Sequence, residues 1–99
     1  MTIGDTAVTV DGAAVTPEFF PGAGIQPLLG RSLVEADYRS EGRPVVILSH
    51  DLWAERFESA PRIIGQEIEI DERRVTVVGV MPVGFKFPED ARLWMPRSD

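Results

Sequence analysis

The sequence contains no cysteine, which excludes disulfide scaffolds, thiolate metal sites and cysteine nucleophiles. It has one lysine, Lys86, so the other nine of its ten basic residues are arginines, and the net charge is −6. These arginines are scattered along the chain. Nucleic acids and anionic lipid surfaces require clustered positive charge, so we expect neither as a partner.

Long apolar runs are also missing. No stretch approaches the roughly 18 apolar residues that a membrane-spanning helix needs, and the N-terminus lacks the basic and apolar regions of a signal peptide. Both absences describe only this stretch of sequence. A hydrophobic content of 43% over 99 residues supports one core. We therefore expect residues 1–99 to form a single domain.

Two short segments are apolar on both faces, Val45–Leu48 and Val75–Val80, which is typical of central strands. Ile68 and Ile70 alternate with glutamates and predict a half-buried strand. Residues 52–57, which follow the first of these segments, carry apolar side chains at helical spacing. With nine glycines and eight prolines, the sequence predicts a loop-rich α/β (α+β) domain: a small mixed sheet, one main helix and short helical turns.

The remaining segments predict shorter elements. Residues 6–15 indicate a strand or loose hairpin turning at Asp11-Gly12, and Thr16-Pro17 indicates a short helix that stops at Pro21. Further expectations are an extended piece at 30–33, a polar surface loop at 35–43, a helical turn at Pro61–Ile64, a turn at 71–73 and a final edge strand at Leu93–Met95.

Ser49, His50 and Asp51 are the three residue types of a hydrolase triad, but they are consecutive. A triad requires convergence in space, whereas neighbouring residues point to opposite faces of a strand or fan around a helix. Ser49 also lacks the flanking glycines of a nucleophile elbow. It lies between a strand pattern and a helix pattern, where serine caps the helix, and Asp51 suits the first helical turn. The sequence therefore predicts a helix cap and no catalytic residues.

The glycines at 22, 24 and 30 do not form a phosphate-binding motif. Pro27 interrupts the glycine spacing of a dinucleotide loop, and Lys86 is far from where a P-loop lysine would stand. We interpret these residues as turn glycines and predict no nucleotide binding, no cofactor and no metal site. Glu55, Glu58, Glu67 and Glu69 are interpreted as solvated side chains.

The segment VMPVGFKFPED leaves two interpretations open. Phe85 and Phe87 fall on one face of an extended piece, with Lys86 opposite. They either close the core beneath a loop or form an exposed aromatic pair that touches a partner. Trp94 is ambiguous in the same way.

Three segments carry a family resemblance: VTPEFFPGAGIQPLLGRSL, PVVILSHDLWAERF and IIGQEIEIDERRVTVVGVMPVGFKFP. They resemble the MacB-like periplasmic core domain of ABC-type, FtsX-like permeases. The matching motifs are Val15–Phe20, Pro27–Arg31, Val45–Ser49, Trp53–Phe57, Ile63–Gly65, Thr76–Pro82 and Gly84–Pro88. They occur in order, and only their combination is specific. The N-terminal MTIGDT lies outside the resemblance.

The resemblance implies a small α/β lobe of a larger permease, located in the periplasm or outside the cell, with the ATPase elsewhere. It implies partners in the other lobe and the membrane helices of the same permease, and in an extracytoplasmic adaptor or substrate. It carries over no catalytic residue. The expected function is therefore non-enzymatic: coupling ATP-driven membrane motion to something outside. The alternative is a free-standing module that binds a small molecule or peptide through the Phe85/Phe87 loop. A hydrolase with a hidden site is a third, weaker reading.

Overall fold

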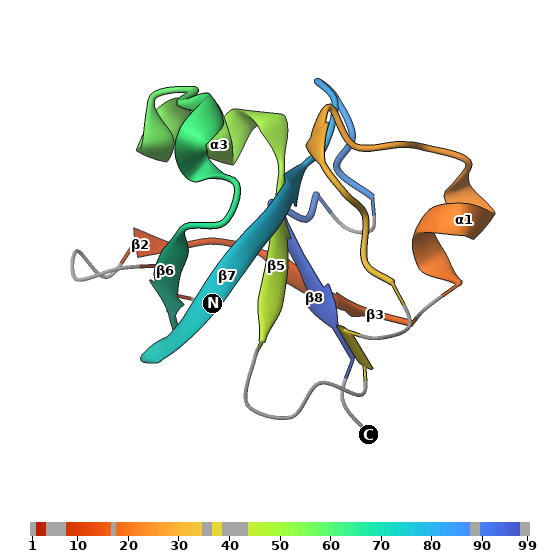
Figure 1. The fold of residues 1–99 in the computed structure, drawn as a ribbon, viewed down its shortest axis with the longest axis horizontal. Coiled ribbons are helices and arrows are strands. Elements are labelled where there is room, and N and C mark those ends of the chain that lie inside the picture. The colour runs from red at the N-terminus through yellow and green to blue at the C-terminus, as the bar shows by residue number, and fades with distance from the viewer. Residues whose placement is uncertain are drawn as a thin grey trace.

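The computed structural model describes residues 2–3, 8–16, 18–34, 37–38, 44–87 and 90–97. Figure 1 shows its elements. In chain order they are β1 (Thr2–Ile3), β2 (Val8–Thr9), β3 (Gly12–Val15), α1 (Phe19–Ala23), β4 (Leu29–Gly30), β5 (Val45–Leu48), α3 (His50–Phe57), the 3-10 helix η1 (Pro61–Ile63), β6 (Glu67–Ile70), β7 (Arg73–Val80) and β8 (Leu93–Pro96). The mixed sheet and the main helix confirm the expected fold class.

The strands form one sheet in the order β2-β1-β6-β7-β5-β8-β3, and β4 pairs with the end of β7. β5 runs parallel to β7, and β3 runs parallel to β8. The other pairings are antiparallel. β7 is the longest strand and contacts three others, so it organises the sheet.

The segment from β2 to β3 connects the two ends of the sheet. These two strands lie at opposite ends of the strand order, yet only Val10 and Asp11 separate them. In Figure 1 this red-orange segment passes behind β7 and β5. Val10 is 5% exposed and belongs to the core cluster that contains Val46 and Val77. Of the two alternatives predicted for residues 6–15, the extended strand is confirmed by β2 and β3. The hairpin at Asp11-Gly12 is wrong, because burial of Val10 holds the chain in an extended path across the sheet.

The core has one cluster on each face of the sheet. Side chains of β5 alternate between them: Val46 and Leu48 join one cluster, Val45 and Ile47 the other. All four are buried, as the sequence predicted. Burying each such side chain contributes about 1.5–3 kcal/mol, so this four-residue strand anchors both halves of the core.

A helix covers each face. Leu52 and Trp53 of α3 pack in the first cluster, and Phe20 of α1 packs in the second. The prediction that α1 stops at Pro21 is wrong. Pro21 lies in the first helical turn, where its missing N–H has no intrahelical partner to lose, and the helix continues to Ala23. Gly24 ends it with a left-handed conformation.

The last strand, β8, is not at an edge, which corrects a third prediction. It lies between β5 and β3, and Trp94 is fully buried. The partner on its outer side is β3, some eighty residues earlier (Gly12 pairs with Leu93), so no local pattern could indicate it. The expected extended piece at 30–33 is instead the short strand β4. Most of the predicted loop at 35–43 lies outside the described residues.

Candidate interaction surface

The Ser49-His50-Asp51 run is a helix start whose three side chains have three different partners. Ser49 is buried, and its Oγ accepts a hydrogen bond of 3.1 Å from the backbone N–H of Leu52, which confirms the predicted cap. The ring of His50 stands edge-on to Trp53, with 5.4 Å between centroids. Asp51 points to Lys86. The three side chains do not converge, so the run is not arranged as a triad.

Asp51 and Lys86 form an ion pair that joins α3 to the segment after β7. The Lys86 Nζ lies 2.8 Å from Asp51 Oδ2. This hydrogen bond lowers the pKa of the Asp51 carboxyl and raises the pKa of the Lys86 ammonium. Both groups are exposed, so the ion pair contributes little to the stability of the fold. Its main effect is to hold Lys86 next to α3.

A second ion pair lies one helical turn further along α3. Arg92 Nη2 is 3.0 Å from Glu55 Oε2, and the Arg92 carbonyl accepts a 2.8 Å hydrogen bond from the Ser49 N–H. Asp51 and Glu55 are four residues apart and thus on one face of the helix. That face holds both Lys86 and Arg92, which belong to the segment between β7 and β8.

Five aromatic rings form one cluster: Phe19 and Phe20 from α1, Phe85 and Phe87 from the segment between β7 and β8, and Trp94 from β8. Trp94 is the buried centre, with Phe85 at 5.3 Å and Phe20 at 6.2 Å. Phe85 is partly buried and packs against the core. The core-closure interpretation therefore holds for Phe85 and for Trp94.

Phe87 differs from the other four rings because 64% of it is exposed. It stacks on Phe19 with 5.9 Å between centroids and 4° between planes. Its carbonyl accepts a 2.8 Å hydrogen bond from the indole N–H of Trp94. Phe87 is thus a solvent-facing ring held in a defined position, as the alternative interpretation required.

Other large apolar side chains are exposed on the segments around β4 and after β7. They are Ile25, Leu28, Val34 and Val83. Leu28 is tied to the end of β7 by its N–H, which donates to the Val80 carbonyl at 2.7 Å. The candidate interaction surface consists of the stacked rings of Phe87 and Phe19, together with Val83, which is exposed four residues before Phe87.

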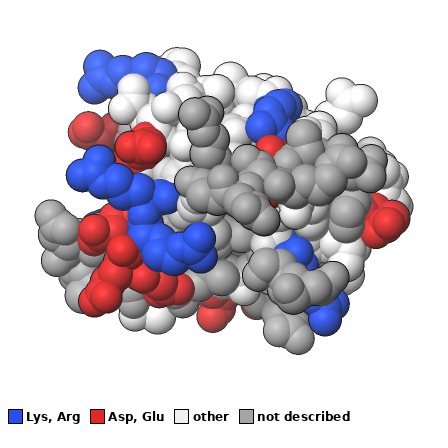
Figure 2. All heavy atoms as spheres, turned by 60° about the horizontal axis from the view of Figure 1, so that its bottom comes forward, with Lys and Arg blue, Asp and Glu red and all other residues white. Residues whose placement is uncertain are grey.

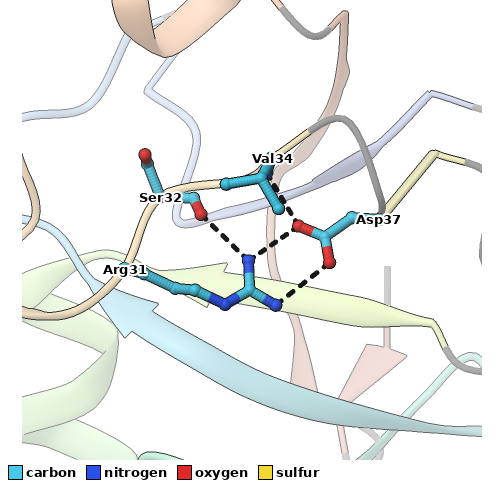
Figure 3. A network of polar contacts seen from close by, with 4 residues as sticks. All are labelled: Arg31, Ser32, Val34 and Asp37. Carbon is cyan, nitrogen blue, oxygen red and sulfur yellow. Dashed lines mark hydrogen bonds and ion pairs between the residues drawn. The ribbon is translucent and has the colours of Figure 1, made fainter.

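Arg31, in the PLLGR motif, forms an ion pair with Asp37 that sequence reasoning did not detect (Figure 3). Its guanidinium donates two hydrogen bonds to Asp37, of 2.8 and 3.0 Å, and a third to the Ser32 carbonyl. The Val34 N–H also donates to Asp37, at 2.8 Å. Burial opposes ionisation of Asp37, but the hydrogen bonds from Arg31 and Val34 outweigh it and lower the pKa. The only signal for this ion pair in the sequence was an aspartate six residues after an arginine. That spacing is too common to identify an ion pair.

Tyr38, the residue after Asp37, is anchored to β3. Its hydroxyl donates a 2.6 Å hydrogen bond to the Val15 carbonyl, which also accepts one from the Arg97 N–H at 2.9 Å. Burial, and then the charges of Asp37 and Glu18, raise the pKa of Tyr38 to about 12. The phenol therefore stays a neutral donor at physiological pH.

The glycines read as turn residues have three different roles. Gly22 lies within α1, Gly24 caps it, and Gly30 pairs with Gly79 in β4 and β7. They do not form a common loop. Within the described ranges, no three acidic or histidine side chains gather to hold a metal ion, and no helix is long and apolar enough to cross a membrane.

Charged side chains of both signs mix on the surface. On the face in Figure 2, arginine and lysine side chains lie beside aspartates and glutamates, with no broad area of one sign. Glu67 and Arg74, at 3.6 Å, are one such exposed pair. This arrangement agrees with the scattered basic residues of the sequence.

Comparison with known proteins gives one family and one fold. The whole chain, residues 1–99, matches the model of the MacB-like periplasmic core domain. A similar solved structure is the periplasmic region of MacB from Actinobacillus actinomycetemcomitans, with a TM-score of 0.67 and 22% identity. The alignment covers 86% of this chain and 36% of that one, so this chain spans about a third of the related region. No curated protein matches.

The fold and the family match define an extracytoplasmic domain of an ABC-type transporter permease. The chain belongs to the MacB-like periplasmic core domain family. The family match begins at residue 1, so the N-terminal segment that the motifs left out is part of the domain. This corrects the narrower extent of the resemblance in the sequence.

Proposed function

We propose that this chain is one domain of a larger permease and couples ATP-driven motion of the membrane part to a substrate or partner protein outside. In this role it performs no chemistry of its own. Membership of the family supports the proposal, as does the share of the related periplasmic region that the chain spans. The other lobe and the membrane helices of the same permease are its expected permanent neighbours.

The observation that carries the proposal is a stiff core joined to a fixed contact surface. A domain that transmits motion must move as a unit, and interiors packed on both faces of a sheet resist deformation. β5 is buried on both faces, and the segment bearing Phe87 is held to α3 by two ion pairs and a backbone hydrogen bond. Displacement of the sheet would therefore displace Phe87 with it.

The test compares ATP hydrolysis and transport in reconstituted membranes. In the full-length permease, residues 1–99 are replaced by a flexible glycine-serine linker. We expect basal ATPase activity to persist and transport or signalling to be lost. The matched control is the intact permease with Val34→Ala, which trims one exposed side chain outside the candidate interaction surface. Transport that survives the replacement in a correctly inserted protein would show that the coupling role is wrong.

The exposed ring of Phe87 favours one other function, a free-standing module that binds a small molecule or peptide. The encoding reading frame separates the two. Four flanking transmembrane helices would establish the permease, and a frame of 99 residues would establish the module. An enzyme would instead reveal itself by turnover of an ester or glycoside panel that His50→Ala abolishes.

A further inference from the structure

The open face of Phe87 is the largest aromatic surface that the described part of the chain presents to solvent. One face of the ring stacks on Phe19, and 64% of the residue remains exposed. The Trp94 indole fixes the Phe87 carbonyl, and the Asp51 carboxylate fixes the neighbouring Lys86. A ring held on both sides loses little freedom on binding, which is the usual property of an aromatic anchor in an interface.

Two exposed acidic residues, Glu18 and Asp90, lie close in sequence to the two stacked rings. Glu18 immediately precedes Phe19, is exposed, and makes no capping hydrogen bond to α1. Asp90 is exposed and shares a turn with Phe87, which the hydrogen bond from the Ala91 N–H to the Lys86 carbonyl closes at 3.0 Å. The cation nearest along the chain, Lys86, is already neutralised by Asp51. Glu18 and Asp90 therefore leave an excess of negative charge on the residues that flank the two stacked rings in sequence, on a chain of net charge −6.

An aromatic face with carboxylates beside it attracts a delocalised cation. A guanidinium is planar, stacks on aromatic rings, and pairs with carboxylates at its edge. We infer that Phe87, with Glu18 and Asp90, binds an arginine side chain on an apolar segment of a partner protein. Val83 would contact apolar residues next to that arginine. This inference rests on the proposed function, because it names the chemistry of the partner outside the membrane.

The experiment uses the 99-residue chain and two blocked peptides. One alternates leucine and arginine, and the other carries citrulline, the neutral isostere, in place of each arginine. Amide chemical shifts in NMR spectra report binding. We expect the arginine peptide to shift signals around Phe19 and Phe87, and the citrulline peptide to bind at least about fivefold more weakly.

Three variants separate the contributions. Phe87→Leu keeps an apolar side chain but removes the ring face, and should weaken binding of the arginine peptide about fivefold. Glu18→Gln combined with Asp90→Asn should have a similar effect and should make binding less sensitive to salt. Val34→Ala, which trims an exposed apolar residue outside the surface, should leave it unchanged. Thermal unfolding of each variant checks that the fold is intact.

Equal affinity for the two peptides, or no binding of either, would overturn the inference. Binding to phosphatidylcholine vesicles that Phe87→Leu abolishes, without binding of the arginine peptide, would also overturn it and identify a lipid surface instead. Either result would leave the coupling role to be judged by the ATPase and transport comparison alone.

Discussion

Gly30 and Gly79 face each other across the pairing of β4 with β7, so closely that neither position has room for a side chain. A Cβ on Gly79 would strike the Arg31 carbonyl, and one on Gly30 would strike the Val78 carbonyl. Gly30 also has a φ of +70°, which favours glycine. This approach is what attaches the PLLGR segment to the central strand.

The first prediction follows from this contact. Gly79→Ala should lower the free energy of unfolding by about 1–3 kcal/mol, because the strands must separate to admit the methyl group. Urea denaturation measures it. The control is Gly22→Ala, where nothing lies within 4 Å of the new Cβ and the helix should gain or keep stability. Equal midpoints for Gly79→Ala and the unmodified chain would contradict the close approach.

Removal of the cap at Ser49 gives the second prediction. Ser49→Ala leaves the Leu52 N–H without its acceptor in a buried place and should cost about 1 kcal/mol. Chemical denaturation measures the loss. Ser59→Ala, at an exposed serine just after α3, should change stability by no more than about 0.5 kcal/mol. If Ser49→Ala shifted the denaturation midpoint no more than Ser59→Ala does, the result would argue against the capping role.

The third prediction concerns acid. The pKa of Asp37 is lowered in the folded chain, so its contribution is present above the ordinary aspartate pKa and is lost as pH falls below it. Asp37→Asn should cost about 1 kcal/mol at neutral pH, a modest figure because Arg31 is half exposed. The difference from the unmodified chain should shrink as pH falls through the lowered pKa of Asp37. Asp51→Asn, in a more exposed pair, is the control. A cost that persists unchanged in acid would contradict the ion pair.

A fourth prediction concerns base. Tyr38 is the only tyrosine, so tyrosinate absorbance reports it alone. We expect a midpoint at about 12, against about 10 for the unfolded chain. Because the folded pKa is raised, the stability that Tyr38 contributes is present below about pH 10 and is lost as pH rises through about 12. Tyr38→Phe should cost about 1 kcal/mol at neutral pH and nothing extra in strong base. A midpoint near 10 in the folded chain would refute the buried hydrogen bond.

Sequence patterns were sufficient for several features that depend on neighbouring residues, although not for the end of α1. The Ser49 cap follows from a serine between two periodicities, and the burial of Val45–Leu48 follows from four consecutive apolar residues. The turn before β7 was also predicted, although it occupies Asp71 and Glu72 and the strand already begins at Arg73. Such features need no knowledge of the rest of the chain.

Contacts between distant residues could not be predicted. Nothing around Leu93 indicates that Gly12 pairs with it, and so β8 was expected at an edge. The same holds for Phe87, whose exposure depends on Phe19 filling one face of the ring. Arg31 was included in a family motif, but its partner Asp37 became apparent only in the structure.

Because β3 pairs with β8, the sheet of this domain can be completed only late in its synthesis. Within this domain, β3 is translated well before its partner β8, because Gly12 pairs with Leu93 and Val15 with Pro96. Contacts so distant in sequence must wait until the intervening loop can close. A nascent chain that stops before residue 93 leaves one side of β5 unpaired, together with its apolar side chains. During synthesis, therefore, this small domain passes through a long interval in which an aggregation-prone edge is open, and it completes its sheet only after nearly all of it has been translated.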